Sequence, residues 1–211
     1  MPTNPWLGIP AADYEAHMAD PAVRQEPCLD AAFATAIAAH RPATVAVLGC
    51  ATGNGLRHLA GRPRRGPAVG IDLNPEYLAI ARARHAARLP ELLLVRADAE
   101  RVELASGRFD LVQAALLFEY VDPDPVLERV ARWLRPGGVL SVVLQLASAR
   151  HRAVTPTAWP SLGRLEPILR PVPPGEFAER ARRHGLACAA PVVTRLASGK
   201  EFAAIDARRE A

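Results

Sequence analysis

Apolar runs alternate with more polar segments along the middle of the chain. The runs predict buried strands over residues 45–48, 68–72, 92–95, 109–115 and 139–146. The segments between them predict helices over residues 53–60, 76–87 and 126–134. The second of these has helical spacing through Tyr77, Ile80 and Ala81 and leaves its arginines for solvent. Strands that alternate with helices are typical of a parallel sheet covered on both faces, so the pattern predicts an α/β fold.

Both ends of the chain depart from this alternation. Residues 1–40 are predicted to be helical and are acidic, with five carboxylates against Arg24 alone. Residues 147–173 are a long, proline-containing stretch that is predicted to be a loop. A helix and then two strands around the turn "ASGK" are predicted at residues 175–184, 187–196 and 201–207. A Ser-Gly turn between apolar runs indicates an antiparallel hairpin at the end of the sheet.

Length and composition suit a single globular domain, because 211 residues with 50% hydrophobic and 23% charged side chains can bury a real core. No apolar run reaches the roughly 18 residues of a membrane-spanning helix. The first ten residues lack the charged and apolar regions of a signal peptide. Cys28, Cys50 and Cys188 are odd in number and far apart, which favours a reducing cytoplasm and predicts no metal site.

The net charge of +4 comes almost entirely from arginine, because Lys200 is the only lysine. The basic cluster Arg62, Arg64 and Arg65 has no aromatic residues among its charges, so a solvated loop explains it better than a nucleic-acid contact. We therefore expect neither a nucleic acid nor a membrane as a partner.

The stretch "VAVLGCATGNG" runs from a predicted strand directly into small residues. Such a turn leaves room either for tight packing or for a ligand against bare backbone N–H groups. The next strand ends at Asp72, where a carboxylate can accept hydrogen bonds from both hydroxyls of a ribose. Asp72 also suits a helix N-cap, but Asn74 is better placed for that role. The turn and Asp72 together predict a nucleoside-binding half-fold.

The glycine spacing argues against a dinucleotide site. The pattern G-x-G-x-x-G would need glycine at residues 51 and 54, where the chain has Ala51 and Asn54, or at residue 58, which is His58. The chain has G-x-A-x-G-x-G instead. A nicotinamide-dependent dehydrogenase is therefore the weaker alternative.

In this spacing the chain resembles the class I S-adenosylmethionine-dependent methyltransferases. Five of their motifs are matched in order by "LGCATGNG", "GIDLNPEYLAIAR" with Asp72, "RADAE" with Asp98, "RFDLVQAALLFEYV" and "WLRPGGVLSVVL". The resemblance implies a Rossmann-like, doubly wound, mostly parallel sheet of seven strands, with helices on both faces and a C-terminal antiparallel hairpin. It implies S-adenosylmethionine as cofactor, bound by Gly49, Cys50, Ala51, Gly53, Asp72, Leu73, Asp98, Ala99 and Ala114. Cys50 is alternatively a small packing residue.

Two positions depart from the family pattern. Val47 stands where the family usually has an acidic residue, and Ala51 stands where it usually has glycine. We interpret both as variation within a subfamily, and loss of cofactor binding is the alternative. On this resemblance one domain spans residues 1–211. It comprises a helical lid, a cofactor-binding core, a substrate-side loop, and a terminal helix with its hairpin, at residues 1–40, 41–146, 147–173 and 174–211.

Four residues are candidates for the methyl-transfer side. Tyr14 and His17 fall with Met18 on one helical face, where they either pack a lid or line the transfer cavity. Glu119 follows the fourth strand, on the catalytic face of such a sheet, or is a surface carboxylate. Gln145 is an amide in an apolar run, so it contacts a substrate or makes a structural hydrogen bond. His17 is the preferred general base if the acceptor arrives protonated.

The implied activity is transfer of a methyl group from S-adenosylmethionine to an oxygen, nitrogen or carbon nucleophile of a small molecule. The alternative is a methyltransferase-like domain that binds cofactor or a partner without catalysis.

Overall fold

A mixed sheet of eight strands forms the centre of the computed structural model, which describes residues 4–62 and 66–210. Arg64 and Arg65 of the basic cluster lie outside the described residues. The strand order is β3-β2-β1-β4-β5-β8-β6, and β7 also pairs with β8. The strands are β1 Val45–Leu48, β2 Val69–Asp72, β3 Leu93–Arg96, β4 Phe109–Ala115, β5 Leu134–Gln145, β6 Leu186–Cys188, β7 Val192–Arg195 and β8 Glu201–Arg209.

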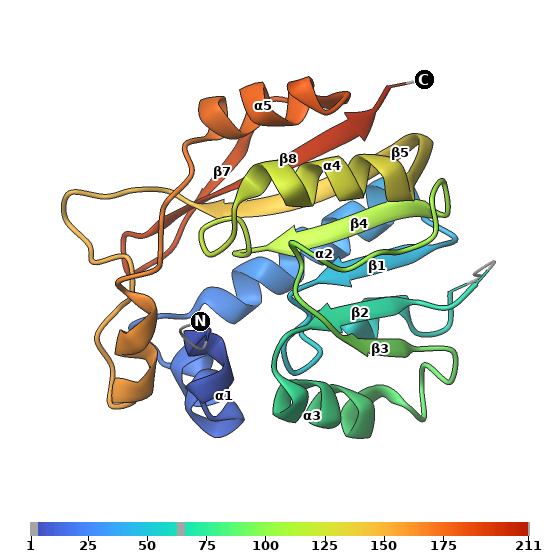
Figure 1. The fold of residues 1–211 in the computed structure, drawn as a ribbon. Coiled ribbons are helices and arrows are strands. Elements are labelled where there is room, and N and C mark those ends of the chain that lie inside the picture. The colour runs from blue at the N-terminus through green and yellow to red at the C-terminus, as the bar shows by residue number, and fades with distance from the viewer. Residues whose placement is uncertain (1–3, 63–65, 211) are drawn as a thin grey trace.

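Helices cover both faces of this sheet (Figure 1). The α-helices are α1 Ala11–Ala19, α2 Gln25–His40, α3 Pro75–His85, α4 Pro123–Trp133 and α5 Pro174–Arg183. Three short 3-10 helices are η1 Pro5–Gly8, η2 Leu56–Leu59 and η3 Pro160–Leu165. Strands β1 to β5 are parallel, whereas β8 runs antiparallel to β5, β6 and β7. This arrangement confirms the predicted Rossmann-like fold class and the C-terminal antiparallel hairpin.

Side chains of β1 show how the sequence separates the two faces. Ala46 and Leu48 belong to the core that also contains side chains of α4 and α5. Val45 and Val47 belong to the core that contains side chains of α2 and α3. Successive side chains of a strand point to opposite faces, so a continuous apolar run is what a sheet buried on both sides requires.

The helix predicted over residues 53–60 is wrong, because only the single 3-10 turn of η2 forms there. Gly53 and Gly55 have φ of 94° and 76°, and residues in that region of backbone space cannot continue an α-helix. A Cβ at Gly53 would lie 2.6 Å from the His85 ring, and one at Gly55 would lie 2.5 Å from the Phe33 ring. Tight packing is therefore why these two positions lack side chains.

The strand predicted over residues 187–196 is divided into two, which makes the sheet one strand larger than the seven predicted. β6 and β7 both pair with β8 and are separated by residues 189–191. Pro191 has no backbone N–H to donate, so a ladder cannot run through it unbroken. The predicted turn between β7 and β8 is present, with Leu196 N donating to Lys200 O at 2.8 Å.

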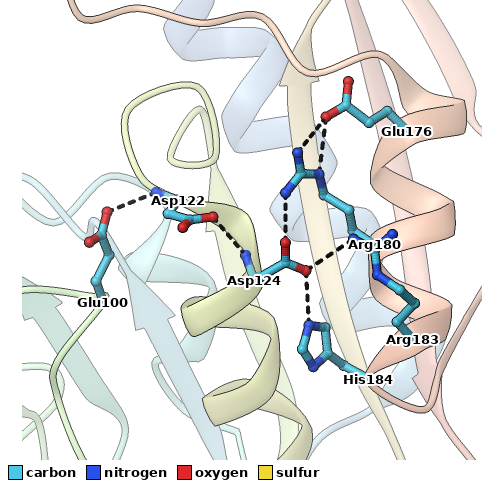
Figure 2. A network of polar contacts seen from close by, with 7 residues as sticks. All are labelled: Glu100, Asp122, Asp124, Glu176, Arg180, Arg183 and His184. Carbon is cyan, nitrogen blue, oxygen red and sulfur yellow. Dashed lines mark hydrogen bonds and ion pairs between the residues drawn. The ribbon is translucent and has the colours of Figure 1, made fainter.

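A network of charged side chains joins α4 to α5 on one face of the sheet (Figure 2). Asp124, in the first turn of α4, accepts hydrogen bonds from Arg180 at 2.7 Å, His184 at 3.0 Å and Arg183 at 3.3 Å. Arg180 also pairs with Glu176, one turn earlier in α5. The hydrogen bond from His184, followed by those of the arginines, lowers the pKa of Asp124. The network orients α5 against the first turn of α4.

The N-terminal segment and the proline-containing stretch pack against each other beside the carboxyl ends of the parallel strands (Figure 1). Ile9, Tyr14 and Met18 share a buried cluster with Leu162 and Leu165 of η3. The stretch 147–173 is thus not wholly irregular, since η3 forms within it. In the described part of the chain, no helix is both long and apolar enough to cross a bilayer.

Candidate functional site

A cavity opens where the parallel strands end. Its wall includes Gly49 after β1, Asp72 of β2, Ala115 of β4 and Gln145 of β5. The carboxyl ends of parallel strands meet at one edge of a sheet, which is where ligands bind in open α/β folds. Ten of the predicted site residues line this cavity, namely Tyr14, His17, Gly49, Ala51, Asp72, Leu73, Asp98, Ala99, Glu119 and Gln145.

The other three predicted site residues do not line it. Ala114 is fully buried in the core beneath α4 and α5. Gly53 faces the His85 ring. Cys50 is buried against Gly70 and lines a smaller hollow behind the glycine turn, as expected of a packing residue.

Asp72 joins the glycine turn to the end of β2. Its Oδ2 accepts a hydrogen bond from the Ala51 N–H at 2.8 Å, and its Oδ1 accepts one from the Asn74 N–H at 2.9 Å. Burial raises the pKa of Asp72, and these backbone hydrogen bonds oppose that shift. Asn74 caps α3 as predicted, accepting from Glu76 N at 3.0 Å. Each carboxylate oxygen of Asp72 has a further lone pair, so it can still accept from a ligand hydroxyl.

Asp98 stands beyond β3 on the same side of the cavity as Asp72. Its Oδ1 accepts a hydrogen bond from Glu100 N at 2.9 Å, and 40% of its side chain is exposed. Ala99 beside it is buried. Asp98 is therefore more accessible than Asp72 and is less fixed by its neighbours.

Tyr14 and His17 project from α1 into the cavity with Met18, so the predicted helical face is present and is turned inward. The Tyr14 hydroxyl accepts a hydrogen bond from Asn54 Nδ2 at 3.0 Å, and its ring centroid lies 5.1 Å from that of Tyr77. Burial raises the pKa of Tyr14, so its hydroxyl stays protonated at neutral pH.

The His17 imidazole is almost fully buried, with 6% exposure. Its Nδ1 lies 2.9 Å from the Thr157 hydroxyl, which anchors α1 to the proline-containing stretch. Burial and then the positive charge of Lys200 lower the pKa of His17. A neutral imidazole at pH 7 can accept a proton, as a general base must.

Glu119 is not a surface carboxylate, because it is 1% exposed. Its Oε1 accepts a hydrogen bond from Gln145 N at 2.6 Å, and its Oε2 has no partner among the described residues. Burial raises the pKa of Glu119 to about 7. Gln145 Nε2 donates to Ala153 O at 2.8 Å, so this amide makes the structural hydrogen bond that was one of its two predicted roles.

Lys200 lines the same cavity and was missed as a site residue. Its side chain is 4% exposed, and its Nζ donates to Ala153 O at 2.8 Å. Burial lowers the pKa of Lys200 to about 8. The available signal was its uniqueness, as a single lysine in a chain that otherwise uses arginine. Trp6 and Tyr120 also line the cavity, and their ring centroids lie 5.1 Å apart. Sequence reasoning missed both as site residues because no sequence motif gives either side chain a role of its own.

Two residues at the site have left-handed backbone conformations that favour glycine. Ala51 in the turn has φ of 46°, and Leu116 after β4 has φ of 52°. Such conformations cost free energy for residues with a Cβ and are found most often at functional sites. Ala51 thus adopts the conformation of the glycine that the family usually has there.

Comparison with known proteins finds similarity to methyltransferases in the region that contains the glycine turn after β1. A family model of the methyltransferase domain matches residues 45–138. A trans-aconitate 2-methyltransferase of Deinococcus radiodurans is 35% identical over 127 residues, which are 58% of this chain and 47% of that protein. A malonyl-[acyl-carrier protein] O-methyltransferase of Laribacter hongkongensis is 36% identical over 109 residues, 48% of this chain and 37% of that protein. The chain thus spans about half or less of the length of these relatives.

Solved structures share the fold. An S-adenosylmethionine-dependent methyltransferase from Mesorhizobium loti superimposes with a TM-score of 0.60 at 20% identity, covering 79% of this chain and 90% of that one. The [4+2]-cyclase SpnF superimposes with a TM-score of 0.63 at 19% identity, covering 80% of this chain and 76% of that one. Since proteins of different names share this architecture, the fold alone does not decide the chemistry.

Proposed function

We propose that this chain, in which residues 45–138 match a methyltransferase domain, is a class I S-adenosylmethionine-dependent methyltransferase and transfers the methyl group of that cofactor to a small molecule. The observation that carries the proposal is one cavity lined both by the cofactor-motif residues Gly49, Asp72 and Asp98 and by His17 and Glu119. A site that held a nucleoside without catalysis would not need buried titratable groups beside it.

The residues present fit S-adenosylmethionine. Asp72 keeps accepting capacity for ribose hydroxyls, and Asp98 is the exposed acceptor for an adenine amine. Gly49, which follows β1, brings bare backbone to the cavity wall on the other side of Asp72 from Asp98. When bound, this cofactor supplies a methyl group already activated on a sulfonium, so the protein needs chiefly to align a nucleophile and exclude water.

Two side chains suit the removal of a proton from an acceptor. His17 is neutral near pH 7 and is held through Nδ1, which leaves Nε2 for the acceptor. The free Oε2 of Glu119 offers a second base above pH 7. We propose His17 as the base for an oxygen or nitrogen nucleophile that arrives protonated. Tyr14 and Gln145 stabilise the cavity wall through hydrogen bonds. The Tyr14 hydroxyl accepts one from Asn54, and the Gln145 amide donates one to Ala153 O.

We also propose a cytoplasmic location, because the three cysteines are unpaired in the structure and suit a reducing compartment.

Mass spectrometry with deuterium-labelled S-adenosylmethionine tests the function. The purified chain should transfer the labelled methyl group to a member of a small-metabolite panel, and His17→Ala should slow transfer to a protonated acceptor at pH 7. Binding of a nicotinamide dinucleotide in the cavity instead of S-adenosylmethionine would contradict the proposal. Binding of S-adenosylmethionine without methyl transfer across the panel would favour the non-catalytic alternative.

A further inference from the structure

The sheet order separates the two ends of the cavity. Asp72 is on β2, whereas Lys200 directly precedes β8, whose first residue lies at the same edge because β8 runs antiparallel to β5. β8 is four strands from β2 and three from β1. At roughly 4.8 Å per strand these separations are about 19 and 14 Å. Lys200 therefore lies at the end of the cavity away from the cofactor motifs.

Lys200 is a buried cation with spare donors. An ammonium group has three N–H donors, and Ala153 O accepts one at 2.8 Å. No carboxylate of the described residues forms an ion pair with Lys200. An isolated buried charge is costly unless something pairs with it, and here the open direction is the cavity.

The other polar groups near this end are neutral or can become so. Burial and Lys200 itself lower the pKa of His17. Gln25, at the start of α2, is 6% exposed and lines the cavity. Glu119 carries a pKa of about 7, so it can present a proton from Oε2 at neutral pH. These groups add hydrogen bonds but no second fixed positive charge.

The walls between Lys200 and the glycine turn are apolar and aromatic. They are formed from the N-terminal segment and the stretch around η3, and include Trp6, Met18, Val154, Leu162 and Leu165. The cavity therefore offers one cationic end and an apolar body. A ligand that matches it has one anionic group on an apolar skeleton.

Building on the proposed function, we propose that Lys200 binds a carboxylate of the methyl acceptor, so that the substrate class is a small carboxylic acid with an apolar body. A single lysine neutralises a monoanion, whereas a phosphate dianion would leave one negative charge uncompensated in a buried site. Lys200 acts here as a specificity residue that anchors the acceptor, and takes no part in the methyl transfer itself.

The first test uses the single lysine as its own probe. Protein grown with [13Cε]lysine should give one lysine side-chain resonance, from Lys200, whose shift reports its protonation. The titration should have its midpoint near pH 8 in the free protein. Saturating hexanoate should raise that midpoint by about one unit, because a bound carboxylate favours the charged ammonium. An unchanged midpoint under hexanoate at millimolar excess would overturn the proposal.

Calorimetry supplies the second test, with hexanoate, hexanamide and hexylphosphonate as probes. The wild type should bind hexanoate about tenfold more tightly than hexanamide, as expected for a charge-assisted hydrogen bond. Lys200→Met should remove that preference, and Lys200→Arg should keep part of it. The control Arg108→Met removes an exposed positive charge at the opposite edge of the sheet and should change nothing. Equal binding of acid and amide, a preference that survives Lys200→Met, or tighter binding of the phosphonate would each overturn the proposal.

Titration of the same samples with S-adenosylmethionine keeps the two proposals apart. If the cofactor binds while hexanoate shows no preference, only the acceptor class fails. If the cofactor does not bind, the proposed function fails whatever hexanoate does. If Lys200→Met does not fold, two measurements still test whether Lys200 binds a carboxylate. They are the shift of the Lys200 titration midpoint in the wild type and the preference of Lys200→Arg for hexanoate over hexanamide.

Discussion

Ala51 occupies a strained backbone position at the centre of the candidate site. Its φ is 46°, and its N–H donates to Asp72. A left-handed conformation costs a residue with a Cβ about 1–2 kcal/mol. The chain tolerates this because the hydrogen bond to Asp72 holds the turn in place. Ala51 also lines the cavity, so the strained position forms part of the wall of the candidate site.

Ala51→Gly should therefore leave the free energy of unfolding within about 0.5 kcal/mol of wild type, because relief of strain offsets the greater freedom of the unfolded glycine. The matched control is Ala36→Gly, a buried alanine inside α2 with ordinary helical geometry. That variant should lose about 1 kcal/mol or more. Urea unfolding of both variants is the measurement. An equal loss in the two variants would contradict the strained turn.

Single residues with local roles were predictable from the sequence, and residues whose role depends on distant packing were not. Asn74 as a cap follows from its position just before a helical run. Gly53 was expected to admit a ligand, yet the His85 ring fills its space because α3 folds back over the turn. Lys200 is buried only because its hairpin and the segment around Ala153 close over it. No local pattern contains that information.

At the scale of elements, Asn74 fixes the N-terminal segment to the sheet. Its Oδ1 caps α3, and its Nδ2 donates to Trp6 O at 3.0 Å and to Ile9 O at 3.3 Å. One buried amide thus couples α3 to the segment that leads into α1. The site needs this coupling because Tyr14 and His17 reach the cavity from α1.

Asn74→Ala should destabilise the chain by about 2–4 kcal/mol, since it loses both the cap and the partners of two carbonyl groups. Asp122→Ala is the control, because Asp122 caps α4 through Asp124 N and its side chain makes no hydrogen bond or ion pair with another segment of the described residues. It should cost about 1 kcal/mol. Denaturant unfolding followed by tryptophan fluorescence compares them. If both variants lost the same free energy, Asn74 would be a cap and nothing more.

Strand and helix placement was predictable where a long apolar period exists. β4 has the predicted bounds, and α3 and α5 differ from their predicted helices by one or two residues. The predictions failed at η2 and at the division of β6 from β7. In both places glycine or proline imposes a backbone conformation that interrupts the helix or strand predicted from the surrounding residues. There the tertiary packing decides, and a short window of sequence does not show it.

At the scale of the whole molecule, Glu119 should govern how stability changes with pH. Its pKa is about 7 in the folded chain, above the ordinary value of 4.5. A carboxyl whose pKa is raised by folding makes its full contribution to stability below the pKa that it has in the unfolded chain. That contribution is lost as the pH rises through the pKa that it has in the folded chain. Between about pH 4.5 and 7 this carboxyl therefore removes up to about 3 kcal/mol from the free energy of unfolding.

Glu119→Gln should abolish that loss, so the variant should gain on the wild type from pH 5 to about pH 7, and the difference should level off by pH 8. His17 and Lys200 also contribute to the profile, but they are the same in both proteins and cancel in the difference. Glu128→Gln, an exposed carboxyl on α4, serves as control and should follow the wild type. Urea unfolding at intervals of one pH unit gives the profiles. A constant difference between Glu119→Gln and wild type would show that Glu119 is ionised throughout.

The central claim is that Asp72 and the glycine turn bind S-adenosylmethionine, and calorimetric titration of that cofactor tests it most directly. Wild type should bind it at one site. Asp72→Ala, shown by its melting curve to be folded, should bind about 10- to 150-fold more weakly, the cost of losing hydrogen bonds to a charged group. The loss of Asp72 also frees Ala51 N, so Asp98→Ala, which leaves the turn intact, should weaken binding by less. No binding to wild type, or an unchanged affinity in folded Asp72→Ala, would contradict the account.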